Sequence, residues 1–191
     1  MDEKEKHLFI AAGPNGSGKS TFARQFLKQN DYIFINADEI ARELNPTEME
    51  SAKLSAGRVF FQRLYGNIEK GNDILIESTL SGSYFHRYWP KIRENGYKIT
   101  IIFVFLEHPR ICIERIKERV IKGGHYVPDA DVVRRFYRSK RNFWNQYRNE
   151  VDNWYMFFNS DDKFMEVAFG KKNDYIVKNN EIFDLYLQDV M

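Results

Sequence analysis

Runs of apolar residues along the chain alternate with segments in which apolar residues recur at helical spacing. The apolar runs cover residues 7–12, 32–35, 73–77 and 99–106, and each is typical of a strand. The last run is apolar enough for a central strand that is covered on both faces. Between these runs the spacing predicts helices over 19–28, from residue 47 to a stop at Gly71, and over 84–95.

The middle one of these three helices carries the clearest local signals. It follows Pro46, and Thr47 and Glu50 match a capping box at its start. Its predicted buried face consists of Leu54, Phe61, Leu64, Tyr65 and Ile68.

The second half of the chain begins with two helices in succession. Pro109 opens the first, which ends at Gly123 and Gly124, and Asp129 or Asp131 is predicted to cap the second. The predicted inward positions are Cys112, Ile113, Ile116 and Val120 on the first helix and Val132, Phe136, Phe143 and Tyr147 on the second. Strands over 154–159 and 164–169 and a short helix over 182–187 follow. This order predicts an α/β fold of three layers with a mainly parallel sheet, as one domain over residues 1–191.

Composition excludes several classes of protein. Apolar residues make up 43% of the 191 residues, which is enough for a real core and too much for a disordered chain. The longest apolar run has eight residues, whereas a membrane-spanning helix needs about 20, so no membrane role is expected. The first seven residues have no apolar core of a secretory signal, and Cys112 is the one cysteine of the sequence. A cytoplasmic location is therefore expected.

Charge is distributed unevenly. The formal net charge is only +2, which argues against a general role in binding nucleic acid. The segment 110–148, however, has eleven Lys or Arg and four acidic residues, a net +7, while the remainder has eighteen basic and twenty-three acidic residues, a net −5. Such a concentrated positive field attracts phosphate groups.

The chemistry centres on a phosphate-binding loop. Residues 13–20, GPNGSGKS, match the pattern G-x-x-x-x-G-K-[ST] at every fixed position, between a predicted strand and a predicted helix. Glycines let backbone N–H groups converge on phosphates at a helix N-terminus, Lys19 neutralises the β- and γ-phosphates, and Ser20 or Thr21 offers a hydroxyl to Mg²⁺. The expected nucleotide-binding residues are Gly13, Pro14, Asn15, Gly16, Ser17, Gly18, Lys19, Ser20 and Thr21. The alternative is a chance Gly-rich turn.

Two carboxylates follow strands next to this loop. Because ligands bind at the carboxyl ends of parallel strands, both acids are expected at the site. Asp38, after the second strand, is predicted to be the general base that takes the proton of an acceptor hydroxyl. Glu77, at the end of the third strand, is predicted to bind Mg²⁺ through water or to bind the acceptor. The alternatives are a helix N-cap for Asp38 and a solvated strand-end acid for Glu77.

The two basic helices form a predicted lid over the nucleotide, around residues 110–148. Arg115, Arg119 and Lys122 share one helix face, and Arg134, Arg138 and Arg141 share another. An arginine that reaches the transferring phosphoryl group accelerates known reactions by roughly 10³–10⁵. The alternative is a solvated face that pairs with Glu114 and Glu118. Weaker candidates for contact with the acceptor are Arg58, Thr79 and His125; Arg58 is as readily a surface salt bridge, and a lone histidine is more often structural.

Four segments, in this order and spacing, resemble the zeta-toxin family of phosphate-loop kinases, in particular its short stand-alone members. They are AGPNGSGKST at 12–21, NADEIA at 36–41, ESTLSG at 77–82, and RVxxGGHxVP at 119–128 followed by Arg134 and Arg135. The resemblance covers roughly residues 8–160. Its last segment departs from the lid of the toxins whose substrate is established.

This resemblance implies an adenylate-kinase-like fold and phosphorylation of a small-molecule hydroxyl by ATP and Mg²⁺. The best-known members phosphorylate UDP-N-acetylglucosamine and are held inactive by an antitoxin protein, so both are candidate partners. It also implies that Asp38 is the base, that Lys19 is the loop lysine, and that Arg119 and either Arg134 or Arg135 lie near the γ-phosphate.

Two other functions remain open from the sequence. One is a kinase for a different acceptor, such as a nucleoside or an antibiotic. The other is a nucleotide-dependent module that binds nucleic acid through its basic face and hydrolyses ATP slowly. The carboxylate at Asp38 favours a kinase, because a switch needs no acceptor base.

Overall fold

The computed structural model describes residues 5–47, 49–83, 85–160 and 163–190. The strands are β1 (Lys6–Ala12), β2 (Ile33–Ile35), β3 (Ile74–Ser78), β4 (Tyr97–Phe105), β5 (Asn153–Ser160), β6 (Lys163–Lys171) and β7 (Asp174–Val177). The helices are α1 (Lys19–Leu27), α2 (Ala37–Leu44), α3 (Met49–Glu69), α4 (Trp89–Glu94), α5 (Pro109–Ile121), α6 (Asp129–Asn142), α7 (Arg148–Glu150) and α8 (Asn180–Leu187). A 3₁₀ turn, η1 (Phe85–Tyr88), precedes α4, and a π-helical stretch, η2 (Phe143–Tyr147), joins α6 to α7.

The strands form one sheet in the order β2-β3-β1-β4-β5-β6-β7. The first five of these run parallel, and β6 and β7 are antiparallel additions at one edge. β1 pairs with β3 and with β4, so the loop that follows β1 opens in the middle of the parallel part. The predicted α/β class with a mainly parallel sheet is confirmed.

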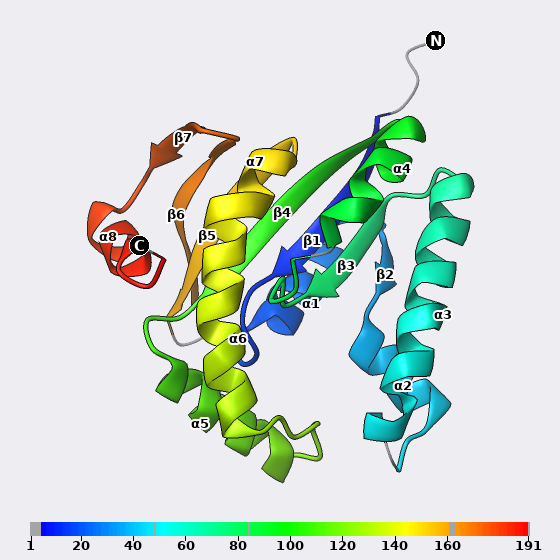
Figure 1. The fold of residues 1–191 in the computed structure, drawn as a ribbon, viewed down its shortest axis with the longest axis horizontal. Coiled ribbons are helices and arrows are strands. Elements are labelled where there is room, and N and C mark those ends of the chain that lie inside the picture. Colours follow the sequence, from blue (N-terminus) through cyan, green and yellow to red (C-terminus); the bar gives the residue numbers. More distant parts are fainter. Residues whose placement is uncertain (1–4, 48, 84, 161–162, 191) are drawn as a thin grey trace.

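Helices cover both faces of the sheet (Figure 1). α3, α4, α6 and α8 lie on one face, where the main core cluster packs around β4, and α1 lies on the other, where Ala23 packs against Ala11 and Leu75. α5 and α6 bury a separate cluster that includes Cys112, Ile116 and Phe136. None of the described helices is both long and apolar enough to cross a membrane.

Several predicted details differ from the structure. Leu54 is 84% exposed, because the buried face of α3 runs instead through Ala52, Ala56, Phe60, Leu64 and Ile68. Pro128, not an aspartate, is the cap residue of α6, and Asp129 and Asp131 occupy the first turn. The helix α2 and the edge strand β7 were not predicted. The Glu50 side chain of the predicted capping box and Tyr84, the first residue of the predicted 84–95 helix, lie outside the described parts of the chain. The rest of that predicted helix forms η1 and α4.

The basic segment also contributes to the core. The Lys140 side chain is fully buried, surrounded by the rings of Phe105, Phe136 and Tyr186, and its ammonium contacts the Asp189 carboxylate. The hydroxyl of Tyr186 donates a hydrogen bond of 2.8 Å to the Lys140 carbonyl. This charge therefore ties α6 to the C-terminal part of the chain and is not available to a ligand, although it is counted in the net +7 of the segment 110–148.

We expect Asp189→Ala to lower the free energy of unfolding by about 3 kcal/mol, because it leaves the buried Lys140 ammonium without its carboxylate. Lys140→Met, which removes the charge and keeps most of the volume, should cost less than about 1.5 kcal/mol. Urea unfolding of the two variants measures the difference. If Asp189→Ala is no more harmful than Lys140→Met, the ion pair does not have this role.

Candidate functional site

The phosphate-loop motif occupies the turn between β1 and α1, at the carboxyl edge of the sheet. Gly13 has φ +135°, and a Cβ there would lie 2.0 Å from the carbonyl oxygen of Val104 on β4. Gly18, the N-cap of α1, has a left-handed conformation with φ +99°. Only glycine fits a tight loop with these two requirements, so the motif here has a structural basis beyond its pattern.

Lys19 points back into the loop. Its Nζ donates a hydrogen bond of 2.9 Å to the carbonyl oxygen of Pro14. Burial lowers the pKa of Lys19, and the carboxylates of Glu77 and Asp38 oppose that shift. The ammonium therefore lies inside the loop, in the field of the two acids that the sequence assigns to the site.

Glu77 is a partner of the loop and not a solvated acid. One carboxylate oxygen accepts a 2.9 Å hydrogen bond from the Ser20 hydroxyl, and the other, Oε1, is buried and has no hydrogen-bond partner among the described residues. Burial raises the pKa of Glu77, while the Lys19 charge and the Ser20 hydrogen bond lower it. A hydroxyl and a carboxylate this close form the hard oxygen pair that Mg²⁺ takes alongside water and phosphate. Thr21 follows on α1 and is half-buried.

Asp38 lies in the first turn of α2, directly after β2. The cap of that helix is Asn36, whose Oδ1 accepts hydrogen bonds from the backbone N–H groups of Asp38 at 2.8 Å and Glu39 at 3.4 Å. The capping alternative for Asp38 is therefore wrong, and Asp38 is exposed. Asp38 raises the pKa of both Lys19 and Glu77, which brings all three groups into one electrostatic cluster.

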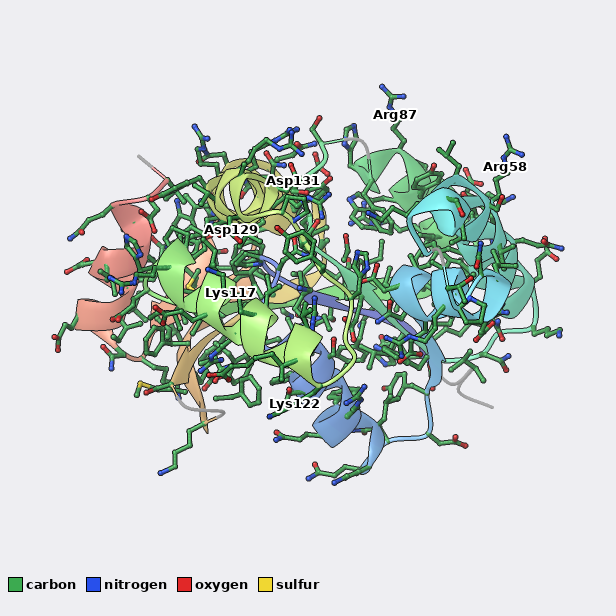
Figure 2. All side chains as sticks on the ribbon, turned by 90° about the horizontal axis from the view of Figure 1, so that it is seen from below. Arg58, Arg87, Lys117, Lys122, Asp129 and Asp131 are labelled. Carbon is green, nitrogen blue, oxygen red and sulfur yellow. The ribbon has the colours of Figure 1, made fainter. Side chains whose placement is uncertain are left out.

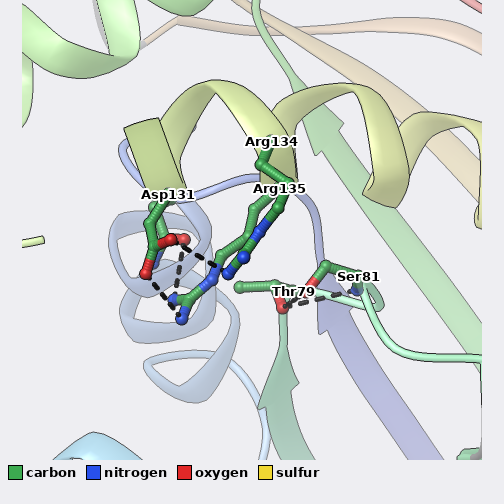
Figure 3. Close-up of polar contacts among 6 residues, drawn as sticks. Thr79, Ser81, Asp131, Arg134 and Arg135 are labelled. Atoms are coloured by element: carbon green, nitrogen blue, oxygen red, sulfur yellow. Dashed lines mark hydrogen bonds and ion pairs between the residues drawn. The ribbon is translucent and has the colours of Figure 1, made fainter. Parts of the chain in front are cut away.

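The arginines of the predicted lid have different surroundings (Figure 3). Arg134 and Arg135 both contact Asp131, at 2.9 and 3.6 Å. Arg135 also donates a 3.4 Å hydrogen bond to Oδ1 of Asn15, a residue of the phosphate loop. Of these two candidates, Arg135 is therefore the one that reaches the loop.

Arg119 is near the C-terminal end of α5, where its guanidinium donates a 2.7 Å hydrogen bond to the His125 carbonyl. Its charge lowers the pKa of Lys19, so the group is within electrostatic range of the loop. A Cβ on Gly124 would lie 2.4 Å from the Arg119 side chain, so the turn after α5 packs on this arginine.

The remaining acceptor candidates are spread more widely. Thr79 follows β3, and its hydroxyl is 2.9 Å from that of Ser81 (Figure 3). His125 is half-buried in the turn between α5 and α6. Arg58 is exposed on α3 and points outward at the rim of the molecule, as Arg87 does (Figure 2). The structure thus joins Ser20 and Glu77 by a hydrogen bond, puts Lys19 within electrostatic range of Glu77 and Asp38, and leaves Arg58 at the rim.

Asn159 of β5 is a part of the site that the sequence did not indicate. Its side chain is fully buried, and its Nδ2 donates a 2.9 Å hydrogen bond to the Ser17 carbonyl of the phosphate loop. A second such residue is Asn142 of α6, whose amide donates to the Leu80 carbonyl at 2.9 Å and so holds the segment after β3. Both contacts span large distances in sequence, which local patterns do not encode.

Proteins of known sequence match about two thirds of this chain. A protein from Haemophilus influenzae described as uncharacterized is 34% identical over 131 residues, which cover 69% of this chain and 91% of that protein. A guanylate kinase from Clostridium perfringens is 24% identical over 152 residues, and the match covers 66% of each chain.

Solved structures share the fold. The AvrRxo1-ORF1:ORF2 complex with ATP superposes with a TM-score of 0.71 and 18% identity, covering 96% of this chain and 64% of that one. The PezAT chromosomal toxin–antitoxin system of Streptococcus pneumoniae gives a TM-score of 0.66 at 15% identity, covering 98% and 80%. These similarities confirm the predicted likeness to zeta-toxin-type phosphate-loop kinases at the level of the fold. A family model described as an AAA domain matches residues 8–140, and the chain therefore belongs to that family.

Proposed function

We propose that the protein is a kinase that transfers the γ-phosphoryl group of ATP to a hydroxyl group of a small molecule. The observation that carries the proposal is the cluster of Lys19, Ser20 and Glu77 at the phosphate loop with a separate exposed carboxylate, Asp38, beside it. A nucleotide switch needs the first three groups alone. The fourth is suited to an acceptor hydroxyl.

In the proposed reaction the acceptor oxygen forms a bond to Pγ while the bond from Pγ to the β–γ bridging oxygen breaks, and ADP leaves. Asp38 takes the proton of the attacking hydroxyl. Lys19 leaves the Pro14 carbonyl and neutralises the β- and γ-phosphates, and the loop N–H groups hold them at the start of α1. Arg135, beside Asn15, is the better placed of the two α6 arginines to neutralise charge on the transferring group, and Arg119 is assigned the same task from α5.

Mg²⁺ fits the pair of Ser20 and Glu77. The second oxygen of Glu77 is buried with no hydrogen-bond partner in the described chain, as expected of a group that is ready to accept water or a cation. When bound, the ion would supply positive charge that neutralises the charge developing on the phosphates. The role of Ser20 and Glu77 is to hold it beside the loop.

UDP-N-acetylglucosamine is the first acceptor to test, because the proposed base and the segment 77–82 correspond to those of zeta toxins. The structural likeness to a toxin–antitoxin system makes an antitoxin a candidate partner. The guanylate kinase similarity adds nucleotides to the acceptors that should be tested.

The test is incubation of the purified protein with Mg²⁺-ATP and a panel of sugar nucleotides, nucleosides, nucleotides and aminoglycosides, with products read by mass spectrometry. We expect one acceptor to gain 80 Da, the mass of a phosphoryl group, with stoichiometric release of ADP. ATP binding without transfer to any acceptor, together with affinity for nucleic acid that falls steeply with salt, would support the binding module instead.

A further inference from the structure

Asn159 holds the phosphate loop from outside the segment that matches the family model. That match ends at residue 140, whereas Asn159 lies near the end of β5, opposite Phe164 of β6. We propose that Asn159 is a positioning residue that fixes the Ser17–Gly18 peptide for phosphate binding. The proposal rests on the proposed function, because it assumes that the loop binds a nucleotide.

The contact is made to the backbone of the loop. Asn159 Nδ2 donates to the Ser17 carbonyl at 2.9 Å, and a Cβ on Gly18 would lie 2.3 Å from the same nitrogen. The side chain therefore packs directly on this peptide. Because Asn159 is fully buried, water does not compete for the hydrogen bond.

The contact with the Ser17 carbonyl also sets the direction of the Gly18 N–H. The described chain has no cis peptide bonds, and in a planar trans peptide the carbonyl and the following N–H point in opposite directions. When Asn159 draws the Ser17 carbonyl toward β5, the Gly18 N–H is turned away from β5. An N–H fixed in that direction is one donor of the concave group of backbone amides that binds phosphate in loops of this type.

Other bonds in the loop leave this peptide dependent on Asn159. The Ser17 N–H donates to the Pro14 carbonyl at 3.2 Å, and the Gly18 carbonyl accepts from the Phe22 N–H at 2.9 Å. These bonds fix the peptides on either side. Gly18, in the left-handed region and with no side chain, has the freedom to rotate the peptide between them.

The hairpin of β5 and β6 is itself held against the start of α1. The Phe22 ring lies 5.2 Å from the rings of both Phe157 and Phe164. Asn159 thus extends from a strand pair that packs against α1. It contacts the loop at the N-terminus of the same helix. Asn159 is therefore already in position to hold the Ser17 carbonyl, and no strand has to move for it to do so.

We expect Asn159→Ala and Asn159→Leu to weaken ADP binding by about tenfold to a hundredfold, measured by calorimetry, since each leaves the Ser17 carbonyl unpaired and the peptide free to turn. Leucine fills most of the space and keeps the variant folded. In NMR spectra, ADP should shift the Gly18 amide resonance strongly in the wild type and less in the variants.

Trp154→Phe is the matched control. Trp154 is also a fully buried residue of β5 whose side chain donates to a main-chain carbonyl, that of Lys172 at 3.2 Å, far from the loop. This variant should lose stability and keep its ADP affinity. Wild-type affinity in both Asn159 variants, or an equal loss in Trp154→Phe, overturns the inference. Failure of the wild type to bind ADP would instead overturn the proposed function.

Discussion

Lys19→Ala is expected to reduce phosphoryl transfer by roughly 10³-fold or more, the scale of losing a preorganised donor to transition-state charge. The ammonium is held inside the loop at 2.9 Å from the Pro14 carbonyl, and no other lysine is part of the motif. Lys19 belongs to the loop and to none of the hydrophobic core clusters, so the fold should persist. Steady-state rates and thermal unfolding of the same preparation separate the two effects.

A matched control for this change is Lys28→Ala, which removes an exposed lysine at the other end of α1. It should leave the rate unchanged. Retention of most ATP-dependent transfer in Lys19→Ala would show that the loop does not bind the nucleotide as proposed.

Asp38→Asn should lower the transfer rate by about 10²–10⁴ while the affinity for ATP changes little. The substitution keeps the shape of the side chain and removes the base. It does not disturb the helix, because Asn36 makes the capping hydrogen bonds of α2. Calorimetric binding of ATP and transfer to the acceptor found in the panel are the paired measurements.

Glu39→Gln serves as the control for Asp38→Asn, since it removes the neighbouring charge in the same helical turn. Transfer should be retained in that variant. If Asp38→Asn instead loses ATP binding along with transfer, the carboxylate serves the nucleotide or its metal, and the assignment of an acceptor site beside it is wrong.

Local patterns were sufficient for the parallel part of the fold. The apolar runs that form β1, β3 and β4 are buried on both faces, so the local sequence is enough to predict them. The phosphate loop is likewise encoded by adjacent residues. The short helix α2 was not predicted, and it begins at a cap, Asn36, that the sequence analysis did not identify. The edge strand β7 was missed because its four residues have little burial to produce a pattern.

The site was predicted where a motif or a strand end marked it, and was missed where a contact spans the sequence. The phosphate-loop pattern located Ser20, and the general rule about strand ends located Glu77, which the parallel pairing of β1 with β3 brings to the same edge. Asn159 lies at the carboxyl end of β5, which pairs in parallel with β4, but the sequence analysis assigned no chemistry to that strand end, and its partner Ser17 is 142 residues away. The structure was also needed to choose Arg135 over Arg134 as the arginine that reaches the phosphate loop. The two are neighbours on one helix, and the sequence does not show which side chain points toward the loop.

The buried pair of Lys140 and Asp189 has a consequence for how the protein is made. Synthesis proceeds from the N-terminus, and folding begins before the whole chain has emerged. A nascent chain that ends at β6 contains the loop, Asp38 and both α6 arginines, yet its Lys140 ammonium has no carboxylate to enter the core with. The Lys140 side chain can therefore enter the core as an ion pair only after Asp189 has been translated.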